Sequence, residues 1–172
     1  ELPSFLDRDG FAKYFASERL GSDTLTAYLL AIANEAGWEI PAEALSRMQN
    51  ALRNFVTGRA GRDSPLQTAD LTIRKVTALE AMSRYQPIEP NLLDSIEAGP
   101  NLWPTSAVLD WYGLMKRGAS LKDRDRHITE AGQILRSRLN FQGTAMGFST
   151  ERTDYLWWLM VSSDVNAVRL IL

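Results

Sequence analysis

The chain contains no cysteine among its 172 residues. This absence excludes disulfide bonds, thiol nucleophiles and cysteine-based zinc sites. It does not identify the compartment, because cytosolic and secreted domains alike can lack cysteine. Histidine is nearly absent too, since His127 is the single one in the sequence. The side chains that most often carry nucleophilic and acid–base chemistry are therefore scarce.

The chain also lacks an excess of charge of one sign. Its 19 Lys and Arg residues oppose 21 Asp and Glu residues, for a net charge of −2. Such a balance does not call for nucleic acid or an anionic membrane as a partner. No apolar run approaches the ~20 residues of a membrane span, and no signal peptide is visible at the N-terminus. We expect no nucleic-acid partner and no direct membrane insertion.

Catalytic motifs are missing as well: HExxH, GxxxxGK[ST], GxGxxG and GxSxG do not occur. His127 stands amid charges in DRDRHITEAG, where a lone histidine is most often a solvated surface residue. As a general base or acyl acceptor it would need a partner nucleophile. Carboxylates occur only in loose groups, Asp7 with Asp9 and Asp123 with Asp125. Positions two apart do not face each other on a helix, so Asp123 and Asp125 are interpreted as a solvated helix start. We assign no catalytic, cofactor-binding or metal-binding residue.

Helix signals, in contrast, are frequent. In GSDTLTAYLLAIANEAGWEIP, Ser22 or Asp23 can cap a helix, Gly37 can end it in the left-handed conformation, and Pro41 suits the start of the next helix. Helices joined by so short a turn lie antiparallel. The same reasoning predicts a loop at 140–150 and helices near 22–37, 41–58, 68–85, 91–98, 102–118 and 122–139, with a helical tail to 172 broken near 162–163.

A weak repeat accompanies these helices. Asp23, Asp70 and Asp164 each follow a small or polar residue and open an apolar helix. Helix pairs recur at roughly 40 to 50 residues, which is typical of stacked hairpins that bury their apolar faces against one another. The predicted fold is therefore all-α, with stacked antiparallel hairpins that form an open solenoid or close into a double ring. We expect residues 1–172 to form a single helical domain, and the uncapped apolar end indicates a fragment of a longer chain.

Aromatic residues gather in the C-terminal half. The adjacent Trp157 and Trp158 point about 100° apart on a helix, so one can be buried while the other contacts another protein. The apolar tail should pack onto the rest of the fold through four candidates: Leu156, Leu159, Met160 and Val168. Five basic residues are spread among acidic ones and are interpreted as solvated faces: Arg59, Arg62, Arg74, Lys75 and Arg84.

Three segments carry a resemblance to a known family: ERLGSDTLTAYLLAIANEAGWEIP, ADLTIRKVTALEAMSRY and LNFQGTAMGFSTERTDYLWWLMVSSDVNAVRLIL. Together they resemble the bacterial alpha-2-macroglobulin family, in and around its thioester domain. The resemblance covers nearly the whole chain, and its C-terminal segment is the most specific. It implies an α/α toroid of the terpenoid cyclase-like kind, incomplete here. It also implies a large multidomain parent in the periplasm or cell envelope that traps attacking proteases.

The chain departs from that family at the reactive centre. Thioester-bearing members form an internal bond between the Cys and Gln of a Cys-x-Glu-Gln motif, and this chain has no cysteine. The resemblance therefore implies a noncatalytic, thioester-domain-like portion of a protease-trapping inhibitor, not an enzyme and without a cofactor. Its partners would be other domains of the parent chain and the target proteases. Two alternatives stay open: an α/α-toroid enzyme of the lyase or glycosidase type, and a helical scaffold that binds protein partners.

A chemical prediction follows from the missing cysteine. The chain should form no covalent adduct with methylamine or with an activated protease, because it holds no acyl donor. Intact-mass spectrometry after incubation should return the unmodified mass. A stable mass increase at one residue would contradict this reading.

Overall fold

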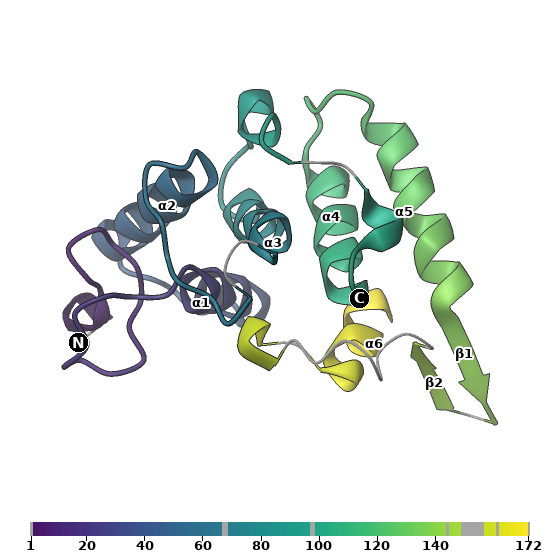
Figure 1. Cartoon of the computed structure of the whole chain (residues 1–172), viewed down its shortest axis with the longest axis horizontal. Coiled ribbons are helices and arrows are strands. Elements are labelled where there is room, and N and C mark those ends of the chain that lie inside the picture. Colours follow the sequence, from purple (N-terminus) through teal and green to yellow (C-terminus); the bar gives the residue numbers. More distant parts are fainter. Residues whose placement is uncertain are drawn as a thin grey trace.

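The computed structural model describes residues 2–66, 69–96, 99–143, 145–148, 157–160 and 162–171. These residues are mostly helical, which confirms the all-α prediction (Figure 1). The α-helices are α1 Asp23–Ala36, α2 Ala42–Val56, α3 Leu71–Ser83, α4 Thr105–Arg117, α5 Arg124–Arg138 and α6 Ser163–Ile171. Short 3-10 turns are η1 Leu2–Phe5, η2 Pro90–Leu93, η3 Pro100–Leu102 and η5 Trp157–Leu159. No helix in the described ranges is long and apolar enough to cross a membrane.

The opening helix begins and ends as its sequence predicts. The Ser22 side chain accepts a hydrogen bond from the Leu25 N–H at 3.2 Å and so satisfies one of the free donors of the first turn. Gly37 ends the helix at φ 67°, a conformation that costs other residues more. The Trp38 N–H then donates to the Ala33 carbonyl at 2.8 Å and closes the C-terminal cap.

Helices α1 and α3 run side by side in the same direction. At one end Arg74 of α3 binds Asp23 of α1, and at the other end Arg84, just after α3, binds Glu35 of α1. Helix α2 follows α1 after five residues and therefore returns in the opposite direction.

Helix α4 repeats this direction on the other side of α3. Thr77 of α3 bonds to Asp110 of α4, and Glu80 bonds to Arg117 one to two turns further along both helices. Helix α5 then runs back along α4, because Arg124 at its start donates to the Met115 carbonyl near the end of α4. Three parallel helices, α1, α3 and α4, thus have antiparallel partners in α2 and α5.

The hairpin prediction is confirmed for α1–α2 and α4–α5. Helix α3 is followed instead by the short turns η2 and η3, so the predicted helix near 91–98 is shorter than expected. Pro90 and Pro100 open these turns, and a proline cannot continue a helix that precedes it. The helices form an open row in Figure 1, with α1 and α2 at one end and α5 at the other. The closed toroid stays a prediction.

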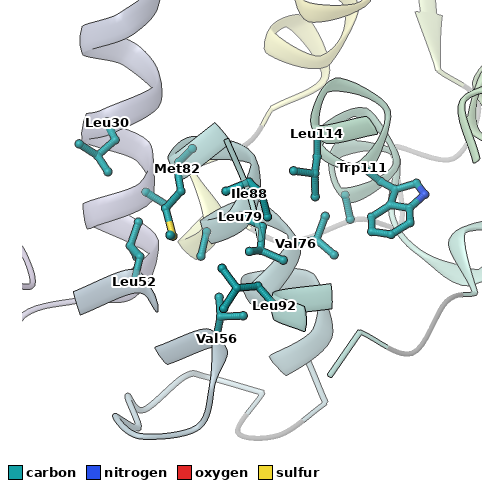
Figure 2. Close-up of a cluster of buried hydrophobic side chains, with 14 of the residues drawn as sticks. Leu30, Leu52, Val56, Val76, Leu79, Met82, Ile88, Leu92, Trp111 and Leu114 are labelled. Carbon is teal, nitrogen blue, oxygen red and sulfur yellow. The ribbon is translucent and has the colours of Figure 1, made fainter. Parts of the chain in front are cut away.

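The core is centred on α3. Figure 2 shows its apolar side chains between those of the flanking helices and the segment that follows α3. Fully buried examples are Leu30 of α1, Leu52 and Val56 of α2, Val76, Leu79 and Met82 of α3, and Leu114 of α4. These α3 residues recur at three-residue spacing, which places them on one face of the helix.

The predicted loop at 140–150 is wrong in part. Strands β1 Leu139–Gln142 and β2 Ala145–Phe148 pair antiparallel, with Asn140 opposite Gly147. The turn begins at Gly143, whose φ of 63° suits a tight hairpin. Phe148 is buried, whereas Phe141 is exposed. Glycine is typical of loops, but at positive φ it also permits the tight reversal between two short strands.

The tail breaks near the predicted position, because α6 begins at Ser163 after a residue at positive φ, Met160. Leu159 is 5% exposed, as predicted, and Met160 is half-buried. Val168 is 54% exposed, so its predicted burial is wrong. The face of α6 that turns inward carries Asn166 and the polar end of Arg169 instead. Leu156 lies outside the described residues.

The burial of Leu159 gives a stability prediction. Leu159→Ala should lower the free energy of unfolding by about 2–5 kcal/mol, the usual range for a large-to-small change at a buried site. Val168→Ala is the matched control and should change it by less than about 0.5 kcal/mol. Urea unfolding followed by circular dichroism measures both. Equal effects would mean that the 157–171 segment packs in another register.

Candidate functional site

The strongest polar feature is a buried arginine between two helix starts. Arg74 binds both carboxylate oxygens of Asp23, with Nη2–Oδ1 at 2.7 Å and Nε–Oδ2 at 2.9 Å. Its Nη1 also lies 3.4 Å from Asp70 Oδ1. All three residues are almost fully buried. Burial alone lowers the pKa of Arg74, but the hydrogen bonds and charges of Asp23 and Asp70 outweigh it and raise that pKa above its ordinary value.

Asp70 extends this cluster to the C-terminal segment. Its Oδ2 accepts hydrogen bonds from the Ser64 hydroxyl and, at 3.0 Å, from Trp158 Nε1. Trp158 is half-buried, so its indole N–H ties the 157–160 segment to the start of α3. An intermolecular contact at Trp158 stays a prediction. The side chain of Trp157 lies outside the described residues.

A second cluster surrounds Glu80, which is 2% exposed. Arg84 Nε bonds to both of its oxygens, at 2.9 and 3.0 Å, and Arg117 Nη1 bonds to Oε1 at 3.0 Å. Arg84 Nη2 also lies 2.8 Å from Glu35 Oε1. Burial lowers the pKa of Arg84, whereas Glu80 and then Glu35 raise it, and the net shift is upward.

A third cluster joins α6 to α4. Asp110 accepts hydrogen bonds from Arg169 of α6 and, at 2.6 Å, from the Thr77 hydroxyl of α3. The charge of Asp110 is the largest influence on Arg169 and raises its pKa despite burial. Asp110 therefore holds three helices at one point.

The second and third clusters line a groove bounded by α1, α3, α4 and α6. It consists of two adjoining pockets of about 380 and 440 Å³. Both pockets are lined by Glu35, Glu80, Arg84 and Arg169. The first also has an apolar wall that includes Tyr28, Ile32, Leu159, Val165 and Val168. Buried carboxylates thus reach the groove, and each is bound by an arginine.

A fourth cluster folds the N-terminal segment. The Asp7 carboxylate accepts hydrogen bonds from the N–H groups of Phe11 and Gly21 at 2.9 and 2.8 Å and from Arg62 Nη2 at 2.9 Å. Burial on its own raises the pKa of Asp7, but these bonds outweigh it and place the pKa below the ordinary value of 3.8. Arg62 also binds Asp9 at 2.9 Å. The loose Asp7–Asp9 group is therefore structural.

Several sequence interpretations need correction. Arg62, Arg74 and Arg84 were expected on solvated faces, yet their side chains are 9%, 2% and 6% exposed. Asp70 and Glu80 stand four residues before Arg74 and Arg84, a spacing that is equally typical of exposed pairs on one helix. The partners from other elements, Asp7, Asp23 and Glu35, are distant in sequence, and local patterns do not indicate them. Arg59 is exposed, as predicted, and Lys75 is half-buried.

His127 was expected to be solvated, but its side chain is only 16% exposed. Its ring packs edge-on against Trp111, with the ring centroids 5.3 Å apart. Trp111 in turn packs edge-on against Trp103 at 5.7 Å. The interpretation of Asp123 and Asp125 as a solvated helix start is confirmed, since their side chains are 48% and 90% exposed.

Within the described ranges, no group of three or more His, Cys, Asp or Glu residues could hold a metal ion. Comparison of the chain with protein-family models, curated proteins and solved structures finds no significant match. The relationship to alpha-2-macroglobulins therefore stays a prediction from the three segments quoted above.

The Asp7 cluster gives a second stability prediction. Asp7→Asn should cost about 3–5 kcal/mol near neutral pH, because it leaves the buried Arg62 without its main counter-charge. Asp9→Asn is the control, since the Asp9 side chain is 39% exposed, and should cost less than about 1 kcal/mol. Urea unfolding of both variants provides the comparison.

The same cluster sets a pH dependence. The pKa of Asp7 is lower in the folded protein than in the unfolded chain, so ionised Asp7 stabilises the fold. This contribution to the free energy of unfolding is complete above about pH 4. It is lost as the pH falls through the lowered pKa of the folded state. Asp7→Asn should therefore flatten the acid side of the stability curve. An unchanged acid slope would show that Asp7 does not carry this dependence.

Proposed function

We propose that the chain is a noncatalytic helical portion of a bacterial alpha-2-macroglobulin-like protein that traps proteases. The observation that supports it most is the parallel course of α1, α3 and α4 with α2 and α5 returning antiparallel. An α/α toroid needs such an alternation of inner and outer helices, whereas neighbouring helices in an up-and-down bundle alternate in direction. The three segments quoted above add the resemblance to this family.

The state of the buried carboxylates supports a noncatalytic role. Glu80 and Asp110 reach the groove, but both are bound by arginines. Arg84 and Arg117 bind Glu80, and Arg169 binds Asp110. These ion pairs connect neighbouring helices. Without cysteine the chain also cannot form the family's thioester. In this proposal it is a fragment of a larger periplasmic or envelope protein, with that protein's other domains and its target proteases as partners.

The enzyme alternative has one observation in its favour, namely that two buried carboxylates line one groove. A glycosidase of the usual kind needs one carboxyl group to donate a proton and the other to act as base or nucleophile. Hydrolysis of a glycoside that is lost in a folded Glu80→Gln variant would favour this alternative. A helical scaffold for protein partners remains the third candidate.

The trap proposal predicts a difference between substrates of different size. The complete protein encoded by the gene, incubated with an active protease, should block cleavage of a large protein substrate while cleavage of a short chromogenic peptide continues. Physical enclosure hinders large substrates, whereas occupation of the protease active site stops both. Equal activity of the protease toward both substrates, with and without the protein, would contradict the proposal.

A further inference from the structure

The groove has opposite charges at its two ends. Asp164 of α6 lines only the 380 Å³ pocket, whereas Lys116 and Arg117 of α4 line only the 440 Å³ pocket. Asp164, Lys116 and Arg117 are exposed. Arg117 also binds Glu80. The remaining charged side chains along the groove belong to ion pairs, namely Arg84 with Glu35 and Glu80, and Arg169 with Asp110. The charge that faces solvent is therefore negative at one end and positive at the other.

Apolar side chains occupy the surface between these ends. Tyr28 of α1 and Val165 and Val168 of α6 line the groove and are 36%, 44% and 54% exposed. Grouped on facing helices, they form an apolar strip rather than scattered surface residues. Such a strip between charged ends is typical of a contact surface with an apolar centre and a polar rim.

We propose that a second copy of this chain covers the groove, related to the first by a two-fold axis across the apolar strip. A two-fold contact uses the same surface patch on both copies. When one residue of the first copy contacts a second residue of the other copy, the reverse contact forms as well. Turning the groove by half a revolution places the Asp164 end of one copy against the Lys116 and Arg117 end of the other. The apolar strips then meet at the centre.

The charge distribution favours a second copy over other occupants. A uniformly basic or acidic partner would be attracted to the end of the groove that carries the opposite charge. At the other end it would place like charges in contact, which weakens association strongly. A copy of the same chain matches both ends with one type of contact. The net charge of −2 adds little repulsion between copies. This inference is independent of the proposed protease-trapping function.

Charge reversal at the two ends tests the proposal. Asp164→Lys and Lys116→Glu each place like charges in both end contacts, so each variant alone should dimerise at least about tenfold more weakly than the original chain. In an equal mixture both end contacts again join opposite charges, and the mixed dimer should form. Sedimentation equilibrium over a concentration series at low salt, where screening is weakest, gives the dissociation constants.

Asp125→Lys is the control, because the Asp125 side chain on α5 is 90% exposed and lies outside the groove. It should leave the dissociation constant unchanged. Circular dichroism checks that all variants keep their helices. Three results would overturn the proposal: a monomer at every concentration, a dimer that neither reversal weakens, or two weakened variants that fail to associate when mixed.

Discussion

The buried contact between Arg74 and Asp23 is the interaction on which most of the architecture depends. It joins the starts of α1 and α3 and so sets their parallel direction. The same guanidinium lies beside Asp70, which holds Trp158 of the C-terminal segment. An arginine and two carboxylates removed from water repay their desolvation only when the geometry and hydrogen bonding are nearly complete. The folded arrangement therefore tolerates little displacement at this point, whereas a purely apolar contact would permit sliding.

Helix α3 has two buried faces of different character, and this explains its central place. Its apolar face carries Val76, Leu79 and Met82 toward the core in Figure 2. A second face carries Arg74, Thr77 and Glu80, followed by Arg84 just beyond the helix, each bonded to α1 or α4 or to a neighbour on this face. The polar residues recur at three- or four-residue spacing, as one stripe of a helix requires. Apolar burial supplies the attraction between α3 and its neighbours, and the polar stripe fixes their direction and register.

The sequence predicted what depends on local chemistry. Caps, turn residues and helical periodicity located the helices α1 to α5, because these signals act over a few neighbouring residues. The repeat of Asp23 and Asp70 was visible too, although its meaning was not: both residues face Arg74. The arginine clusters were missed because their partners lie far away in the sequence, 51 residues apart for Asp23 and Arg74 and 59 for Asp110 and Arg169. A charge on a helix is usually solvated, and only the fold brings a distant counter-charge to it. The β1–β2 hairpin and the exposure of Val168 were missed because a short segment does not fix its own register.

The central claim, that the buried Asp23–Arg74 pair couples α1 to α3, is tested most directly by a double-mutant cycle. The free energy of unfolding would be measured for Asp23→Asn, Arg74→Gln and the combined variant. Substitutions within one buried hydrogen-bonded network have non-additive effects on the free energy of unfolding. The double variant should therefore lose less than the sum of the two single losses, by about 1–3 kcal/mol. Additive effects, with a coupling energy below about 0.5 kcal/mol, would contradict the account and show that the helices hold their direction without this pair.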